Sequence, residues 1–546
     1  MQGVVRTPRQ LNNSALNQWL NQSISETNKH SGTTDCMADP VGRWMQDVRV
    51  MIELECMCVL QAKTFQSSAV DMAKLSRHKK SNIIRLRQKV CEISADFVNF
   101  YNNLDSTDLK DIRKLAIRLT NQIEKLVRNC LDFLYAQSVP FSISEKQEQV
   151  RRQSSMLLCH MENFNREGSF GTGVVPVLKT LSSLGHAFAG LAETIQSNLV
   201  RSLLEDIQGS ASMYHLRVAL QSLQSLTTDY KEISNIIIKE DGLQILCQIC
   251  SINNVDAMKV DALRTIGVLC ETQEARIEFE KANGIPVLAH LLSSESSIEV
   301  KAEVARILAQ ITSPNVDSIH HLIGFIEYLD DLLRELTELC KLAPSPSVFM
   351  VATAAISNIT FMDSMSCDYL ATYNTAEALL SGCKSGKAES LYCKDQIATT
   401  LANMVSSKAC RQQVIDADGV RVLLNLLDEA VLPLKSINQE DLRRMHELCE
   451  SVQQKALIAL GRLAQTKTSA MVIIEIQGAK RLADLCYNSL ERNNSDSVLL
   501  ASLVALRRLS TFNASSGLDD MVIEQLIKPR ITDSFLFCSK EKESFV

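Results

Sequence analysis

Two carboxylates near the amino end, Glu53 and Glu55, carry charge in a stretch of the chain that is otherwise strongly apolar. At about 100° per residue along a helix, Glu55 points into the main apolar stripe and Glu53 lies on its border. Burying an unpaired carboxylate costs a large free energy, so these acids require cations from whatever surrounds them. The chemistry they predict is ion pairing with a binding partner.

The segment that carries these acids, residues 40–65, is predicted to be a helix that binds a partner. Asp39 can cap its first turn, and Pro40 suits the first helical position, where a missing N–H costs nothing. Apolar residues then recur at steps of three and four on one face, and others occupy the opposite face. A helix that is apolar on most sides is normally enclosed by protein. The predicted contact residues are Trp44, Met45, Val48, Ile52, Glu53, Glu55, Met57 and Leu60.

An alternative is that this helix is the first helix of the domain behind it and docks internally. Its flanks favour a helix that is free to bind another protein. Residues 1–39 are rich in Asn, Gln, Ser and Thr and are predicted to be disordered, and residues 66–82 are predicted to be a polar, basic linker.

The last residues form a second candidate binding element, in a predicted tail over 531–546. Ser544, Phe545 and Val546 end the chain with serine, any residue, valine and a free carboxylate. PDZ domains capture such ends by adding the peptide as a strand and binding its carboxylate. Such an ending arises by chance in about 3% of chains, so it indicates a PDZ contact without proving one.

Three other motifs suggest chemistry but are incomplete. The glycine-bearing run 168–174 resembles the phosphate-covering loop of kinases, yet the other kinase motifs do not occur. Cys247-x-x-Cys250 has zinc-like spacing without a second pair of ligands, so both thiols are predicted to fill the core. His320-His321 lacks a recognisable carboxylate partner. The sequence therefore predicts no catalytic site, no metal and no cofactor.

Composition limits the class of protein further. The chain has 546 residues, a formal net charge of −6 and 17 cysteines. The acidic balance argues against nucleic-acid binding, and an odd number of cysteines at apolar positions fits a reducing compartment. No signal peptide and no run of about 18 apolar residues occurs, so no integral membrane segment is expected. These features predict a cytoplasmic or peripheral protein.

Internal repeats give the strongest prediction of fold. Amphipathic segments that open with a small residue recur at intervals of 42 and 43 residues in two places, the period of HEAT and armadillo units. A 92-residue interval fits two such units, and a 59-residue interval implies an insertion. Alanine-rich segments that can pack closely follow the amphipathic ones. The opening glycines are expected to serve a sharp corner between helices, and an insertion is expected near 432–440. The first set is 242–250, 284–292, 376–383, 419–427 and 478–486; the second is 260–270, 300–312, 348–360, 394–405, 452–464 and 498–510.

The predicted fold class is all-α, with an armadillo-like α-solenoid over residues 225–530 and a helical bundle or cap over 83–215 before it. The basic residues of 74–89 are expected in a solvated linker and helix start, with lipid contact or a nuclear signal as alternatives.

Asn358 and Asn403 are candidate groove residues of the solenoid. They occupy positions where armadillo proteins that bind extended peptides place an asparagine. The aromatic residue expected four positions earlier is Ala354 in one case and Thr399 in the other. Peptide capture is therefore one interpretation, and helix capping or amide bonding in the core is the alternative.

The chain resembles the Inscuteable family of adaptors for oriented and asymmetric cell division. The matching residues are Arg43-Trp44-Met45, the run 53–63, and the runs 357–361, 505–509, 533–536 and 543–546. The resemblance implies that the helix lies in the concave channel of the TPR repeats of a Pins/LGN protein, with Glu53 and Glu55 paired to basic residues there. It also implies that the repeats and the C-terminus engage the polarity scaffold Bazooka/Par and its PDZ domains.

Together these interpretations predict an adaptor that is not an enzyme and lies at the apical cell cortex. It would link the apical polarity complex to Pins/LGN and so orient the mitotic spindle, with two modest contacts raising the effective concentration there. A higher-order assembly with the TPR partner stays open. The alternative is a structural solenoid of catenin type in which the helix of 40–65 docks internally.

Overall fold

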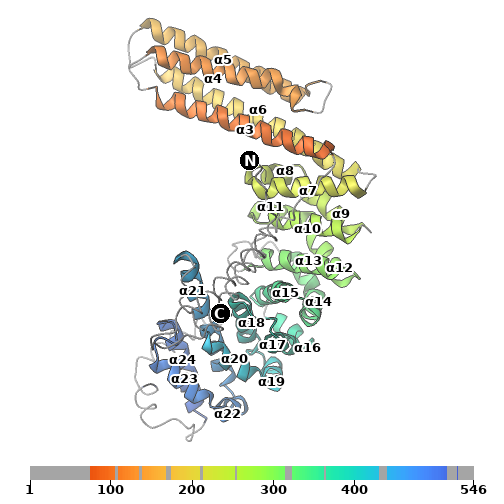
Figure 1. Cartoon of the computed structure of the whole chain (residues 1–546), viewed down its shortest axis with the longest axis vertical. Helices are drawn as coiled ribbons and strands as arrows, with labels where there is room; N and C mark the ends of the chain where they lie inside the picture. Colours follow the sequence, from red (N-terminus) through yellow and green to blue (C-terminus); the bar gives the residue numbers. More distant parts are fainter. Residues whose placement is uncertain are drawn as a thin grey trace, which may run out of the picture. The chain divides into compact units, whose positions relative to one another are not determined.

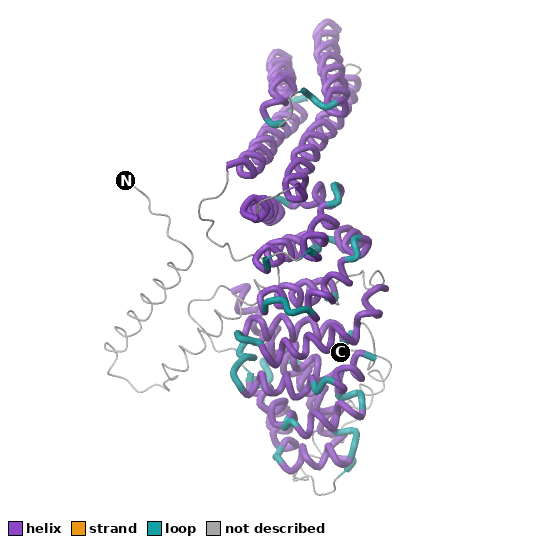
Figure 2. Tube along the Cα trace, turned by 90° about the vertical axis from the view of Figure 1, so that its right-hand side faces the viewer, coloured by secondary structure: helices purple, strands orange, loops and turns teal. Residues whose placement is uncertain are grey.

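The structure is a computed structural model that describes residues 74–104, 109–134, 138–167, 174–209, 213–252, 255–313, 323–361, 365–429 and 439–512, and Leu526. Every regular element among these residues is a helix (Figures 1 and 2). The chain divides into two compact units, Asp71–Ala282 and Met1–Val70 with Asn283–Val546. The all-α class predicted from the sequence is confirmed.

Four long helices form a bundle at the start of the first unit. They are α3 (Lys74–Asn102), α4 (Leu109–Arg128), α5 (Phe141–Glu167) and α6 (Val174–Gly209), with a short 3-10 turn, η1 (Asn129–Asp132), after α4. Each helix packs on the next, and α6 packs back on α3 (Figure 1). Apolar residues at helical spacing fill the interior and are fully buried: Ile83, Leu86, Phe100, Leu119, Ile143, Leu157 and Leu184. The predicted bundle is therefore present.

The first bundle helix begins earlier than the sequence predicts. Helix α3 starts at Lys74, so the linker predicted over 66–82 is wrong from Lys74 onward. Lys79 is only 5% exposed, and its ammonium group lies 2.6 Å from Asp206 of α6 and donates a hydrogen bond to the Ser202 carbonyl. Because the acidic partner of Lys79 is far away in the sequence, nothing near this basic, polar stretch indicated that it forms a packed helix.

A second basic residue of the predicted linker and helix start also packs within this unit. The Arg87 guanidinium lies 4.4 Å from the centre of the Tyr230 ring and 3.0 Å from the Glu232 carboxylate. Cation–π contact and the ion pair together fix the N-terminal half of α3 to the helices that follow the bundle. The basic cluster is thus partly structural. The interpretation as a solvated segment is wrong for Lys79, whereas the Arg87 side chain is half-buried in the helix start.

The rest of the first unit consists of shorter helices. They are α7 (Met213–Asp229), α8 (Lys231–Lys239), α9 (Gly242–Ser251), α10 (Asp256–Leu269) and α11 (Gln273–Lys281). Helix α7 packs along α10, as successive long helices do in the repeats below. It straddles the predicted end of the cap at 215 and the predicted start of the repeats at 225, so the repeat-like packing begins at Met213.

The second unit repeats one order of helices: a short helix, a middle helix and a long helix. Its elements are α12 (Gly284–Ser293), α13 (Ile298–Ile311), η3 (Ile323–Tyr328), α14 (Leu329–Leu342), α15 (Pro346–Ile359), α16 (Ser366–Thr372), α17 (Thr375–Lys384), α18 (Leu391–Met404), α19 (Lys408–Asp416), α20 (Gly419–Asn425), η4 (Leu426–Asp428), α21 (Gln439–Leu463), α22 (Lys467–Glu475), α23 (Gly478–Tyr487) and α24 (Asp496–Ser510). Helices α13, α15, α18, α21 and α24 pack on one another in this order, and we call them the long-helix stack. This arrangement is the predicted armadillo-like α-solenoid.

The insertion expected near 432–440 falls where α21, the fourth helix of the long-helix stack, is extended. Helix α21 has 25 residues, whereas α18 has 14. The extra turns begin at Gln439, and the preceding residues 430–438 lie outside the described part of the chain.

A left-handed residue marks the corner between a short helix and the middle helix that follows it. The φ angles are 58° at Asp241, 56° at Asn283, 55° at Asn374, 62° at Asp418 and 60° at Gln477. Asparagine and aspartate tolerate this conformation better than other side chains. The positive φ therefore belongs to the residue before each opening position, a feature that was not predicted from the sequence. Helix α17 opens at Thr375, one residue before the predicted Ala376.

At three of these corners glycine follows because the backbone passes too close to the preceding short helix for a side chain. A Cβ at Gly242 would lie 2.7 Å from the Ile237 carbonyl oxygen, and one at Gly419 would lie 2.6 Å from that of Val414. Gly478 has the same relation to Ile473, at 2.8 Å. The prediction of a corner is right, and its cause is close approach of backbone to backbone.

We expect Gly419→Ala to lower the free energy of unfolding by about 1–3 kcal/mol, because the added methyl group overlaps the Val414 carbonyl oxygen. Gly461→Ala on α21 is the matched control, since the nearest neighbour of its Cβ would lie at 3.6 Å. Urea unfolding of both variants and the parent chain measures the difference. An unchanged free energy for Gly419→Ala, or an equal loss in the control, would contradict this account of the corner.

Candidate partner-binding sites

Most of the sites predicted from the sequence lie outside the described residues. These are the helix of 40–65 with Trp44, Met45, Val48, Ile52, Glu53, Glu55, Met57 and Leu60, the tail with Ser544, Phe545 and Val546, the loop 168–173 and His320-His321. The structure does describe the two candidate groove asparagines, the cysteine pair and the surfaces around them.

Asn358 and Asn403 both join neighbouring members of the long-helix stack. They are 8% and 7% exposed. The side-chain amide of Asn358 donates a hydrogen bond of 2.7 Å to the Ala309 carbonyl at the end of α13. That of Asn403 donates one of 2.8 Å to the Thr360 hydroxyl just after α15. This geometry favours amide bonding in the core, the alternative weighed from the sequence.

Arg462 makes the corresponding contact one repeat later. Its guanidinium on α21 donates a hydrogen bond of 2.6 Å to the Ala402 carbonyl on α18. Three successive long helices therefore each reach back to the helix before them from the same position near their C-terminal end. Since buried carbonyl groups need a donor, these bonds fix the stacking of the repeats.

A set of buried ion pairs between α18 and its neighbours was not predicted from the sequence. Asp395 is 5% exposed and accepts hydrogen bonds from Lys455 at 2.9 Å and from Ser451 at 2.6 Å. Lys394, also buried, pairs with Glu429. The signal in the sequence is a lysine and an aspartate side by side in an otherwise uncharged helix. Because these charges already have partners, they serve packing more readily than capture of a charged ligand.

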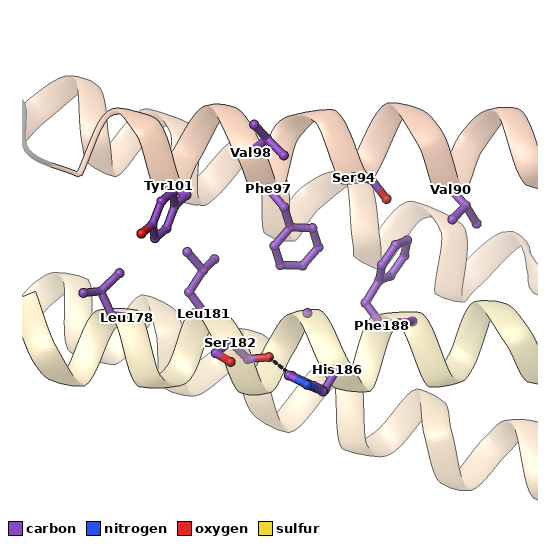
Figure 3. A pocket seen from close by; sticks show the side chains of 12 residues that line it. Val90, Ser94, Phe97, Val98, Tyr101, Leu178, Leu181, Ser182, His186 and Phe188 are labelled. Carbon is purple, nitrogen blue, oxygen red and sulfur yellow. Dashed lines mark hydrogen bonds between the residues drawn. The ribbon is translucent and has the colours of Figure 1, made fainter. Parts of the chain in front are cut away.

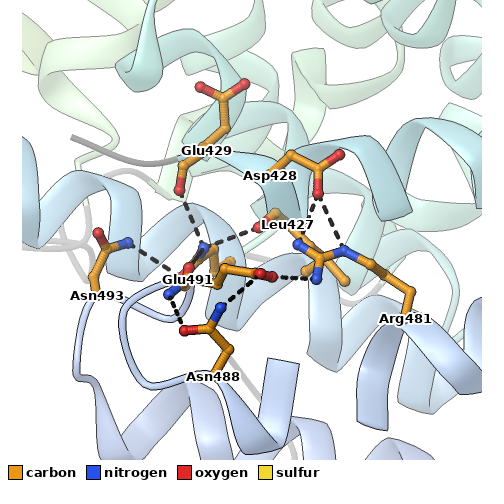
Figure 4. Close-up of polar contacts among 8 residues, drawn as sticks. Leu427, Asp428, Glu429, Arg481, Asn488, Glu491 and Asn493 are labelled. Carbon is orange, nitrogen blue, oxygen red and sulfur yellow. Dashed lines mark hydrogen bonds and ion pairs between the residues drawn. The ribbon is translucent and has the colours of Figure 1, made fainter. Parts of the chain in front are cut away.

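The side chain of Gln453 links the last repeats through hydrogen bonds (Figure 4). Its side-chain nitrogen lies 3.0 Å from the Leu427 carbonyl and 2.7 Å from the Glu491 carbonyl, and Asn493 donates to its oxygen. Beside it Arg481 binds Asp428 at 2.7 Å and also Glu491, and this cation holds the pKa of the Glu491 carboxyl below its usual range. The helices that precede the tail are thus cross-linked by polar contacts.

The cysteine pair lies in the core, as predicted. Cys247 and Cys250 are 3% and 1% exposed on α9. Burial raises the pKa of the Cys247 thiol to about 12 and that of the Cys250 thiol further, so neither is a ready thiolate ligand. Within the described ranges no cluster of three or more metal-ligating side chains occurs. No helix among those described is long and apolar enough to span a bilayer.

Two family profiles match this chain. One, described as the C-terminal part of protein inscuteable, covers residues 89–546, and the other, described as the Inscuteable LGN-binding domain, covers residues 36–69. The chain is 33% identical over 521 residues to the protein inscuteable homolog of Homo sapiens, covering 93% of this chain and 88% of that protein. The homolog of Mus musculus is 33% identical over 516 residues, with the same coverage.

The similar solved structures include engineered proteins and designed armadillo repeat proteins. An engineered protein aligns with a TM-score of 0.46 at 19% identity, over 76% of this chain and 99% of that one. A designed armadillo repeat protein in complex with the peptide (KR)4 aligns with a TM-score of 0.37 at 21% identity, over 48% of this chain and 98% of that one. The assignment of the fold rests on the helices and their packing described above.

We expect Asn358→Ala to lower the free energy of unfolding by about 1–3 kcal/mol, because the buried Ala309 carbonyl loses its donor. Asn425→Ala is the matched control, since Asn425 is an exposed residue at the end of α20. Urea unfolding measures both. If the two variants had the same free energy of unfolding, Asn358 would again be a candidate ligand-binding residue.

Proposed function

The chain belongs to the Inscuteable family, and from this premise we propose that it is a non-enzymatic adaptor that joins an LGN/Pins-type protein to a polarity scaffold. In this proposal the N-terminal helix of 40–65 binds the TPR repeats of the LGN/Pins protein, and the C-terminal part binds a PDZ scaffold of the Bazooka/Par type. The adaptor acts at the apical cell cortex and passes the asymmetry of the cortex to the mitotic spindle.

The observation that carries the proposal is the match of residues 36–69 to the Inscuteable LGN-binding domain. That range contains the whole predicted helix, including the acids Glu53 and Glu55. Large apolar side chains such as Trp44 are the anchors expected at the centre of an interface, and paired charges fix the register of the bound segment. The chemistry of the segment and the family match therefore support the same partner.

The order of elements along the chain supports two separate contacts. The predicted LGN-binding segment precedes α3, and the predicted PDZ ligand, Ser544 to Val546, follows the last long helix, α24. Two contacts on one chain raise the effective concentration of each partner near the other, so modest affinities suffice for joint recruitment. Calorimetry of a peptide of residues 39–63 with an LGN protein tests the first contact directly, and absence of binding would overturn the proposal.

We expect Glu55→Arg to weaken binding of the full chain to LGN by about 2–5 kcal/mol, because the cations that receive Glu55 would then face like charge. Gln46→Arg is the matched control, since nine residues along a helix place Gln46 on the side opposite Glu55. Calorimetry measures both affinities, and circular dichroism confirms that the fold is retained. An affinity for Glu55→Arg equal to that of the control would remove the assigned role of this acid.

We expect deletion of Ser544 to Val546 to abolish binding to PDZ domains of a Bazooka/Par-type scaffold while leaving LGN binding unchanged. The reason is that PDZ capture requires the terminal carboxylate together with the side chains just before it. Ser539→Ala is the matched control outside the terminal motif. Fluorescence polarisation with isolated PDZ domains measures the effect, and undiminished PDZ binding by the truncated chain would contradict the role of the tail.

A further inference from the structure

An open apolar groove lies between the first and last helices of the bundle (Figure 3). Residues 90–101 of α3 form one wall and residues 178–189 of α6 form the other, and the space between them measures about 600 Å³. Phe97 and Phe188 form its floor, with ring centres 5.8 Å apart. The groove lies wholly within the first unit and is separate from the long-helix stack.

The walls of the groove expose apolar surface that the bundle does not cover. Val98 is 59% exposed and Tyr101 is 61% exposed, both on α3. The α6 wall presents small residues, Ser182, Gly185 and Ala189, at steps of three and four. This spacing puts them on one helix face, where small side chains let a further helix approach closely.

The lining of the groove also restricts the charge of its occupant. No carboxylate, lysine or arginine belongs to the residues that line it. His186 is the one imidazole among them, and its ring nitrogen Nδ1 is bonded to the Ser182 carbonyl at 2.7 Å. A charged side chain placed in this groove would lose water without gaining a partner. The surface therefore fits an uncharged, apolar face of a helix.

The position of the groove in the chain identifies which protein can supply that helix. The family match to the LGN-binding domain ends at residue 69, and α3 begins at Lys74. The four residues between them span at most about 14 Å, so a protein bound to 36–69 is held beside the start of α3. At a rise of about 1.5 Å per residue, the groove starts about 24 Å further along α3, at Val90, within reach of a protein-sized partner.

We propose that the α3–α6 groove is a second docking surface for the LGN-type protein, which seats an uncharged apolar helix face in it. This inference rests on the proposed function, because it requires that residues 36–69 bind LGN. The ion pair of Lys79 with Asp206 joins α3 to α6, the two helices that form the walls of the groove. The full chain then binds LGN through two linked contacts.

The test compares the affinity for LGN of the full chain and of a synthetic peptide of residues 36–69, measured by calorimetry. We expect the full chain to bind about a hundredfold more tightly than the peptide, as a linked second contact allows. The double variant Val98→Lys, Ser182→Lys places charge in the groove and should bind no more tightly than the peptide. The control pair, Ala95→Lys with Ser183→Lys, alters exposed residues of the same helices outside the groove and should bind like the parent chain.

Three other outcomes would contradict either the proposed function or the groove as a docking surface. A peptide that does not bind LGN contradicts the proposed function itself. If the peptide, the full chain and the double variant all bind LGN with equal affinity, the proposed function stands, but the groove is not a docking surface for LGN. The full chain could also bind LGN more weakly than the peptide, with the affinity restored in the double variant. That result would mean that residues of this chain occupy the groove, and it would also overturn the proposal. Circular dichroism verifies that both double variants keep the helix content of the parent chain.

Discussion

The backbone corner between a short and a middle helix is the constraint on which most of the stacked repeats depend. A left-handed residue turns the chain, and at Gly242, Gly419 and Gly478 the next residue lies against the carbonyl oxygen of a residue five positions back. A side chain at these glycines would push the middle helix outward. After the Gly419 corner, the long helix α21 would then lose the registration that lets Arg462 reach the Ala402 carbonyl of the preceding repeat. Close packing and hydrogen bonding thus share one geometric origin in this repeat.

The fold could be predicted from the sequence because the apolar residues of each repeat are periodic and local. Small residues opened the middle helices and alanines marked the long helices, and both were placed within a few residues of where they lie. The alignment at Ala376 was one residue late because Thr375 replaces the glycine, and glycine was the marker used. The corner glycines were expected because a side chain would obstruct the turn, and the close approach of Gly242, Gly419 and Gly478 to a carbonyl oxygen confirms this. The left-handed residue before each corner was not predicted.

Contacts between residues that are far apart in the sequence could not be predicted from it. Lys79 was placed in a linker because its acidic partner, Asp206, is far along the chain, and a basic stretch with few apolar residues is typical of a solvated segment. The buried pair of Asp395 and Lys455 was missed for the same reason. The two groove asparagines were recognised as unusual, but only the structure shows that their amides bond the neighbouring helices. The segment of 40–65 was predicted to bind a partner because an apolar helical pattern with inward acids is local in sequence, and it lies within residues 36–69, which match the Inscuteable LGN-binding domain.

In the function that we propose, different parts of one chain have different tasks: packed repeats provide support, and the segment before α3 provides recognition. Hydrogen–deuterium exchange of the full chain with and without LGN tests this division most directly. We expect the amides of residues 41–63 to exchange rapidly in the free chain and to become protected when LGN is added, while α13 to α24 keep their protection in both states. Strong protection of residues 41–63 in the free chain, unchanged by LGN, would contradict it.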